Sequence, residues 1–168
     1  MERASSSDDI APPRFRITFG ARDGGVHDHR PARDDRRQAR GPPVSDKTRR
    51  LLIVEDDPSL QKQICWAFDQ YEPVAAADRE SALAQLRRHS PPVVTMDLGL
   101  PPDPDSATEG FKLLEEVLAL APDTKVIVLT GQNDRANAVR AIGLGAYDFF
   151  AKPFEPELLA LTIDRAFR

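Results

Sequence analysis

Five short apolar runs, each followed by a stretch with helical periodicity, constrain the fold of this 168-residue chain more than any other feature. The runs are continuous rather than alternating, which is typical of strands covered on both faces in a parallel sheet. Their regular order predicts a (βα)5 chain, which forms a doubly wound α/β sandwich of three layers. The predicted strands are Leu51–Val54, Val74–Ala76, Val93–Met96, Val126–Leu129 and Tyr147–Phe150.

The segments between the runs carry helix signals. Asp57 directly precedes a proline, so we interpret it as a helix N-cap rather than as a metal ligand. Ile64 and Phe68 lie four residues apart and predict one apolar face of the first helix. Trp66 and the helical leucines are interpreted as core residues, because no polar cluster accompanies them. The predicted helices are 58–70, 79–89, 110–121, 133–144 and 154–168.

The composition changes near residue 50. Residues 1–50 contain 12 Lys or Arg and 8 Asp or Glu, whereas residues 51–168 contain 11 and 19. The first segment has too little apolar surface to offset the entropy of ordering it. We therefore expect a disordered basic tail over 1–48 and one folded domain over 49–168. The Arg-rich run Arg30–Arg40 could alternatively serve as an arm for nucleic acid or an acidic partner.

The overall composition excludes several classes of protein. The net charge of −4 for the whole chain does not favour nucleic-acid binding, and we expect no direct nucleic-acid contact by the folded domain. No stretch approaches the roughly 20 apolar residues of a membrane span, and the first 30 residues contain no apolar h-region, so we do not expect secretion. The single cysteine, Cys65, cannot form an internal disulfide. We therefore expect a cytoplasmic protein without membrane contact.

Polar residues follow the predicted strands where the strands end. The carboxyl ends of parallel strands lie at one edge of the sheet, and ligands bind in the crevice outside that edge. We therefore expect four segments to bring carboxylates, one hydroxyl and one ammonium group together. These groups belong to Glu55, Asp56, Asp57, Asp97, Thr130 and Lys152.

Such a cluster of carboxylates indicates a site for a hard divalent cation. The acids repel one another unless a cation neutralises them, and Mg²⁺ prefers carboxylate, water and phosphate oxygens. Asp97 stands alone at the end of its strand and is the candidate nucleophile. Its attack on a phosphorylated donor would give an aspartyl phosphate, with Mg²⁺, Lys152 and Thr130 stabilising the phosphoryl oxygens. The pattern thus predicts phosphoryl transfer to a carboxylate.

The chain from about 49 to 168 resembles the receiver domain of bacterial two-component response regulators. The resemblance implies a flavodoxin-like fold with strand order 2-1-3-4-5, and an Asp97 that accepts a phosphoryl group from a histidine kinase. It rests on Leu-Leu-Ile-Val-Glu-Asp-Asp at 51–57, Val-Val-Thr-Met-Asp-Leu-Gly-Leu-Pro at 93–101, Val-Ile-Val-Leu-Thr-Gly at 126–131 and Gly-Ala-Tyr-Asp-Phe-Phe-Ala-Lys-Pro-Phe at 145–154.

The resemblance also assigns roles position by position. It implies that Asp56 is a direct Mg²⁺ ligand, that Glu55 acts partly through water, and that the Gly99 carbonyl is a further ligand. Thr130 and Lys152 would hold the phosphoryl group. Taken singly, the two acids could be solvated loop residues, Thr130 a helix cap and Lys152 a surface charge. Their joint spacing favours the functional interpretation.

Phosphorylation is expected to remodel one face of the domain. By resemblance, Thr130 moves and Phe149 turns inward, which changes the face formed by the helix at 133–144, the last strand and the last helix. Phe149 could equally be an ordinary half-buried aromatic of the sheet. The remodelled face would pair with a second receiver, as a homodimer, or release an output domain that controls transcription.

Three smaller expectations come from the same resemblance. The Lys152–Pro153 peptide is expected to be cis. Gly131 is expected to leave room for the phosphate beside Thr130. Kinase specificity is expected around the first helix and the loop after the last strand, at Gln61, Gln63, Ile64 and Phe154.

The loop after Asp97 departs from the usual receiver pattern. Gly110 lies thirteen residues after Asp97 instead of about eight, so the loop 101–109 carries about five extra residues. With this loop the chain most resembles receivers of regulators linked to the exosortase (PEP-CTERM) system. Those regulators resemble sigma-54 activators, in which an ATPase domain and a DNA-binding domain follow the receiver.

Alternatives from other classes remain open. Phosphatases of the haloacid dehalogenase type carry a second acid two residues after the nucleophile, where this chain has Gly99, so we expect no enzyme beyond self-directed phosphoryl chemistry. A flavin or nucleotide binder would need a Gly-rich loop after the first strand, where acids stand instead. A stand-alone receiver in a phosphorelay and an unphosphorylated scaffold module remain the alternatives to a transcriptional switch.

Overall fold

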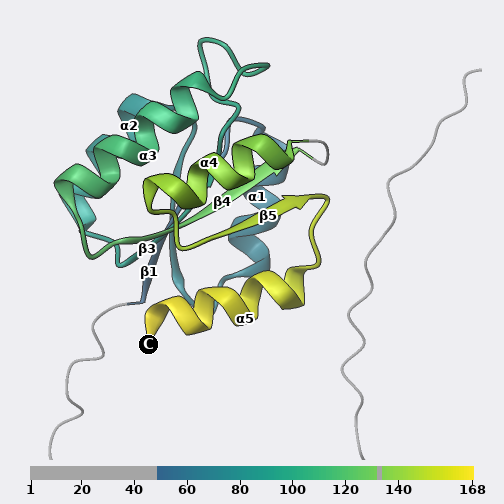
Figure 1. The fold of residues 1–168 in the computed structure, drawn as a ribbon. Coiled ribbons are helices and arrows are strands. Elements are labelled where there is room, and N and C mark those ends of the chain that lie inside the picture. The colour runs from purple at the N-terminus through teal and green to yellow at the C-terminus, as the bar shows by residue number, and fades with distance from the viewer. Residues whose placement is uncertain (1–48, 132–133) are drawn as a thin grey trace, which may run out of the picture. The chain divides into compact units, whose positions relative to one another are not determined.

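The computed structural model describes residues 49–131 and 134–168, and it confirms the predicted (βα)5 architecture (Figure 1). Five parallel strands form one sheet in the order β2-β1-β3-β4-β5, as the resemblance implied. The predicted tail over 1–48 lies outside the described residues. The strands are β1 (Arg50–Val54), β2 (Glu72–Ala76), β3 (Val93–Asp97), β4 (Lys125–Gly131) and β5 (Asp148–Lys152).

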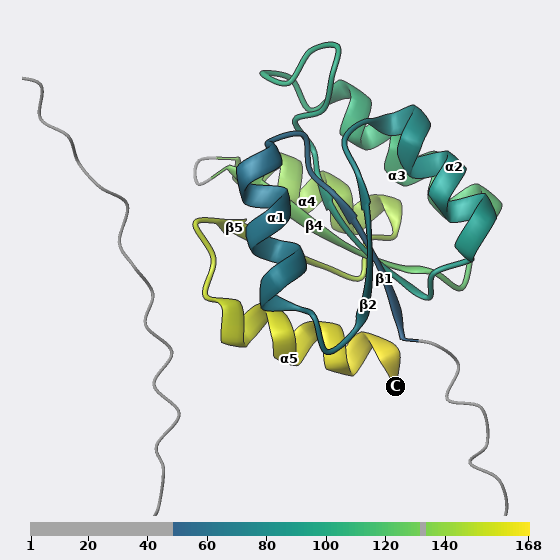
Figure 2. The ribbon, with the colours of Figure 1, turned by 180° about the vertical axis from the view of Figure 1, so that it is seen from behind.

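Helices cover both faces of the sheet. The helices α1 and α5 pack on one face, and α2, α3 and α4 pack on the other (Figures 1 and 2). Successive residues of a strand point to opposite faces, so Leu52 lies under α2 and α3 while Ile53 lies under α1 and α5. The helices are α1 (Pro58–Ala67), α2 (Arg79–His89), α3 (Thr108–Leu120), α4 (Arg135–Leu144) and α5 (Pro156–Phe167).

Burial differs between the central and the edge strands. The apolar residues of β1, β3 and β4 are almost completely buried, as the continuous apolar runs predicted. The same prediction is wrong for β2 and β5, which are largely exposed or half-buried. These two strands form the edges of the sheet, and the helices that cover its middle leave them partly open.

The helix boundaries follow local capping chemistry. The side chain of Asp57 accepts hydrogen bonds from the backbone N–H groups of Ser59 and Leu60, so its predicted role as N-cap of α1 is confirmed. The helix α3 begins at Thr108, two residues earlier than predicted. The helix α5 begins at Pro156, because a proline is favoured at the first helical position.

The predicted burial of Trp66 is wrong, since this residue is 85% exposed. Ile64 and Phe68 form the buried face of α1, and Trp66 follows Ile64 by two residues, about 200° around the helix. Its position therefore faces away from the core. The same prediction holds for Leu113 and Leu159, which are fully buried, but other helical leucines, Leu120, Leu158 and Leu161, are exposed.

The described residues also bear on membrane contact. Among them, none of the helices is both long enough and apolar enough to cross a bilayer.

Candidate functional site

Strand register brings the predicted site residues to one edge of the sheet. Glu55 and Asp56 directly follow β1, next to β3, which ends at Asp97. Asp97 pairs with Leu129 of β4, so Thr130 comes one position further along. Gly131 pairs with Lys152 of β5. Residues far apart in the sequence thus meet because four parallel strands end together.

Three carboxylates form the core of the site. Glu55, Asp56 and Asp97 each place one carboxylate oxygen so that all three oxygens lie within 4.8 Å of one another. Glu55 is only 1% exposed, whereas Asp56 and Asp97 are half-buried. A buried acid among other acids is costly without a neutralising cation, so the arrangement requires a positive partner.

Lys152, the last residue of the outer strand β5, provides a positive partner. Its Nζ donates hydrogen bonds to Glu55 Oε2 at 2.8 Å and to Asp97 Oδ2 at 2.9 Å. The ammonium group therefore bridges the first and third strand ends from β5. Its cis peptide bond to Pro153 agrees with the expectation from the resemblance.

Backbone groups hold the second oxygen of each bridged carboxylate. The N–H of Asp57 donates to Glu55 Oε1, and the N–H of Gly99 donates to Asp97 Oδ1, both at 3.1 Å. Each carboxylate is thus held by the ammonium at one oxygen and by an amide at the other. Hydrogen bonds to both oxygens restrict the rotation of a carboxylate and favour its charged form.

The environment shifts the pKa of the buried pair. Burial raises the pKa of Glu55 above its ordinary value, and the hydrogen bonds from Lys152 and from the Asp57 amide offset part of that rise. Burial alone would lower the pKa of Lys152, but its bonds to Glu55 and Asp97 outweigh burial, and the pKa of Lys152 is raised. Lys152 therefore stays charged at neutral pH.

The donor atoms of the site fit a hard divalent cation. The three clustered side chains offer only carboxylate oxygens, which are the ligands that Mg²⁺ prefers, together with water and phosphate oxygens. Receiver domains in general bind Mg²⁺ at such an acidic site. In this chain Glu55, Asp56 and Asp97 are the side chains that would hold the ion.

The other predicted residues surround this cluster. Thr130 is 4% exposed at the end of β4, and a Cβ placed on Gly131 would meet no atom of the described residues within 4 Å, as expected for a position that leaves room. Phe149 of β5 is 40% exposed, and its inward turn on phosphorylation stays a prediction. Ile64 is buried at 2% exposure, which rules it out as a surface contact for a kinase.

Gln61 has a role that its sequence position did not reveal. Its side-chain amide donates to the backbone carbonyls of Glu55 and Ala76, at 3.0 Å each, and so ties α1 to the ends of β1 and β2. Gln61 was predicted only as a possible kinase contact. A polar residue on the first turn of a helix that follows the acidic loop is the signal that could have indicated this bracing role.

Comparisons with known proteins agree with this geometry. The family model described as "Response regulator receiver domain" matches residues 51–164. The phosphate regulon transcriptional regulatory protein PhoB of Klebsiella pneumoniae is 34% identical over 122 residues, which cover 71% of this chain and 52% of that protein. The nitrogen assimilation regulatory protein NtrX of Azorhizobium caulinodans is 30% identical and is covered to 25% of its length.

Solved structures show the same likeness. A response regulator receiver domain protein from Clostridium thermocellum superposes with a TM-score of 0.64 at 25% identity, covering 70% of this chain and 93% of that one. The chain spans about half or less of the curated relatives named above. The match to the family model over most of the chain, with the acid cluster at the strand ends, shows that the chain belongs to the response regulator receiver domain family.

Proposed function

We propose that this domain is a phosphorylation switch that accepts a phosphoryl group from a histidine kinase on Asp97, with Mg²⁺. The convergence of three carboxylates and one ammonium at a single sheet edge carries the proposal. Family membership supports it, because receiver domains work in two-component signalling. We infer that the chain is no enzyme toward other substrates, since its chemistry ends on its own Asp97.

The geometry supports a role for each group in the transfer. A carboxylate oxygen of Asp97 attacks phosphorus, and the bond from phosphorus to the donor's nitrogen breaks, leaving the electron pair on the donor. The Gly99 amide and Lys152 hold the Asp97 carboxylate for this attack. Lys152 and the Thr130 hydroxyl then contact the new phosphoryl oxygens. Mg²⁺, when bound, supplies positive charge against the phosphoryl oxygens.

We infer that the signal leaves through the face formed by α4, β5 and α5. These three elements expose apolar side chains that a partner could cover: Val139 and Ile142 on α4, Phe149 on β5, and Leu158 and Leu161 on α5. Movement of Thr130 toward the phosphoryl group would free space for Phe149 to turn inward. The change would favour a receiver homodimer or free an output domain, which fits the similarity to PhoB, a transcriptional regulatory protein.

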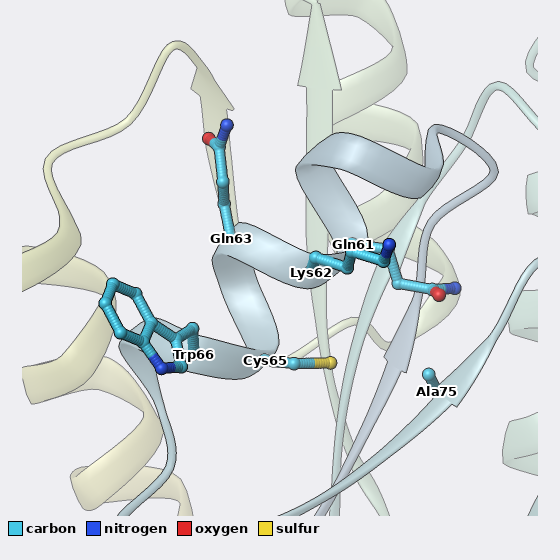
Figure 3. A pocket seen from close by; sticks show the side chains of 6 residues that line it. All are labelled: Gln61, Lys62, Gln63, Cys65, Trp66 and Ala75. Carbon is cyan, nitrogen blue, oxygen red and sulfur yellow. The ribbon is translucent and has the colours of Figure 1, made fainter. Parts of the chain in front are cut away.

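The kinase is proposed to dock beside α1. A shallow hollow on this side is lined largely by α1 residues together with Ala75 of β2, and Figure 3 shows Gln63 and Trp66 pointing away from Cys65 on the helix. The exposed Trp66 and Gln63 offer an apolar and a polar contact on α1. Phe154, in the loop after β5, would extend this surface.

Finer assignments rest on the resemblance alone. We infer a cytoplasmic regulator of the sigma-54 activator type, with an ATPase domain and a DNA-binding domain in the full-length protein, and a relation to the exosortase system. The extended loop 101–109 is the feature that supports this subfamily. The receiver itself would not contact nucleic acid, because the residues from 51 onward carry a strong negative charge.

Intact-protein mass spectrometry tests the proposed function. The chain is incubated with acetyl phosphate with and without Mg²⁺, next to Asp97→Asn and, as a matched control, Asp103→Asn from the exposed loop. A Mg²⁺-dependent gain of one phosphoryl group in the chain and in Asp103→Asn, absent from Asp97→Asn, is expected. A folded protein that gains no phosphoryl group, either from acetyl phosphate or from phosphorylated histidine kinases, would instead support the scaffold alternative.

A further inference from the structure

The backbone that follows Asp97 is enclosed from two sides. A Cβ added to Gly99 would lie 2.4 Å from the Pro104 carbonyl oxygen, and one added to Gly110 would lie 2.4 Å from the Cα of Leu98. Neither glycine has a positive φ, so other residues could adopt the same backbone conformation. Both positions therefore need glycine for space: the loop 101–109 packs on Gly99, and the first turn of α3 packs on Leu98.

The contact of Pro104 with Gly99 affects the proposed phosphoacceptor through one hydrogen bond. The Gly99 N–H donates to Asp97 Oδ1 at 3.1 Å, while Lys152 holds the other oxygen, Oδ2, at 2.9 Å. Displacing the peptide of Gly99 would therefore release one of the two oxygens. Pro104 comes seven positions after Asp97 in the sequence. In space, only Gly99 lies between them: it lies against the Pro104 carbonyl and donates its N–H to Asp97.

Residues 101–105 are exposed, so packing of their side chains does not hold the loop 101–109. A backbone hydrogen bond within the loop and the contacts of its last residue, Glu109, hold it instead. The N–H of Ser106 donates to the carbonyl of Asp103 at 3.1 Å. Glu109 accepts from Arg79 of α2 at 2.8 Å and from Lys112 of α3 at 2.9 Å. Figures 1 and 2 show this loop before α3 projecting beyond the end of the sheet. It is thus an anchored segment that rests on the site at Pro104.

We propose that Pro104 is a positioning residue: its carbonyl, carried by the extended loop, fixes the Gly99 peptide and through it the orientation of Asp97. This inference rests on the proposed function, since it concerns the same carboxylate. The extended loop then has a definite task. It holds the Gly99 N–H on Asp97 Oδ1 and sets the direction of the Gly99 carbonyl, which the resemblance implies is a Mg²⁺ ligand.

The test compares two substitutions of glycine by alanine. Gly99→Ala places a methyl group against Pro104, whereas Gly143→Ala on α4 is the matched control, since a Cβ there meets no atom of the described residues within 4 Å. A third variant removes residues 102–106, which restores the shorter spacing, and a fourth combines this deletion with Gly99→Ala. Isothermal titration measures the Mg²⁺ affinity of each variant, and amide hydrogen exchange by NMR measures protection at residue 99.

We expect Gly99→Ala to weaken Mg²⁺ binding about tenfold and to lower protection at residue 99 by a similar factor, because the peptide must shift. Gly143→Ala should bind as the unchanged chain does. In the shortened loop, Gly99→Ala should have no further effect, because the opposing carbonyl is gone. Equal affinity and protection in Gly99→Ala and the unchanged chain, or an undiminished effect of Gly99→Ala in the shortened loop, would overturn the proposal.

The two readouts separate the inference from the proposed function. If the unchanged chain binds no Mg²⁺, the proposed function fails, and protection at residue 99 alone decides the role of Pro104. If the shortened chain does not fold, as judged by circular dichroism, the comparison of Gly99→Ala with Gly143→Ala decides. A loss of thermal stability in Gly99→Ala without a change in Mg²⁺ affinity or protection would show a structural contact only, and would also overturn the proposal.

Discussion

Replacing Lys152 with methionine should destabilise the domain at neutral pH in the absence of Mg²⁺. The substitution keeps the apolar stem and removes the ammonium that bridges Glu55 and Asp97. At 2.8 Å and an effective dielectric constant near 20, each ion pair has a gross attraction of about 6 kcal/mol. Desolvation of the partners offsets much of this, and removing one partner of a buried pair typically costs about 3 kcal/mol.

The loss should depend on pH in a direction that follows from the pKa of Glu55. Burial raises that pKa, and without Lys152 it should rise further. Protonated Glu55 needs no cation, so the variant suffers little at low pH and increasingly as pH rises through the folded-state pKa. The contribution of Lys152, whose pKa is raised, is complete below the unfolded value of 10.5 and is lost only as pH rises through the folded value.

Urea unfolding followed by circular dichroism at pH 5 and pH 8 measures both effects. Circular dichroism is preferred over tryptophan fluorescence, because Trp66 is 85% exposed and reports poorly on the core. Lys112→Met is the matched control, since Lys112 bonds Glu109 at 2.9 Å on the exposed surface of α3, and its unfolding midpoint should barely change. A loss in Lys152→Met that equals the control, or that is the same at both pH values, would refute the reasoning.

Three further predictions concern the rest of the domain. Thr95→Val should raise the free energy of unfolding by roughly 1 kcal/mol in urea titrations, because the Thr95 hydroxyl is buried without a hydrogen-bond partner among the described residues; destabilisation would contradict this. Trp66→Ala should change that free energy by under about 0.5 kcal/mol, whereas Phe68→Ala should cost about 3 kcal/mol or more; similar losses would place Trp66 back in the core. Burial and the hydrogen bond to Asp164 raise the pKa of Tyr71 to about 12. In urea unfolding, the stability advantage of the unchanged chain over Tyr71→Phe should therefore be constant below pH 10 and vanish between pH 10 and 12. An advantage that persists above pH 12 would exclude this hydrogen bond as its source.

Much of the fold could be predicted from local patterns in the sequence. The buried strands β1, β3 and β4 need apolar residues at every position, and this requirement produces runs such as Leu51–Val54 that few other structures explain. Helix caps are equally local, so Asp57 was identified from its neighbours alone. The edge strands were found, but their exposure was not, because a strand's place in the sheet depends on partners far along the chain.

The composition of the acid cluster could also be predicted, since parallel strands must end at one edge. Glu55, Asp56, Asp97 and Lys152 were expected together for that reason, and the structure places them together. Their roles as ligands, phosphoacceptor and phosphoryl contacts stay predictions. The pairing itself was beyond prediction, because which carboxylate oxygen meets Lys152 and which meets a backbone amide depends on angles that no spacing encodes.

The sequence by itself determined the order of the elements, the buried strands and the acidic edge, because each follows from the chemistry of neighbouring residues. Only the tertiary structure decided that Trp66 faces solvent, that Gln61 braces the acidic loop and that Pro104 rests on Gly99. Packing against the sheet decides which face of a helix is buried. The contacts of a loop depend on which backbone segments lie near it in the folded domain. Such contacts join residues through the folded sheet, so they arise only once the whole domain has formed.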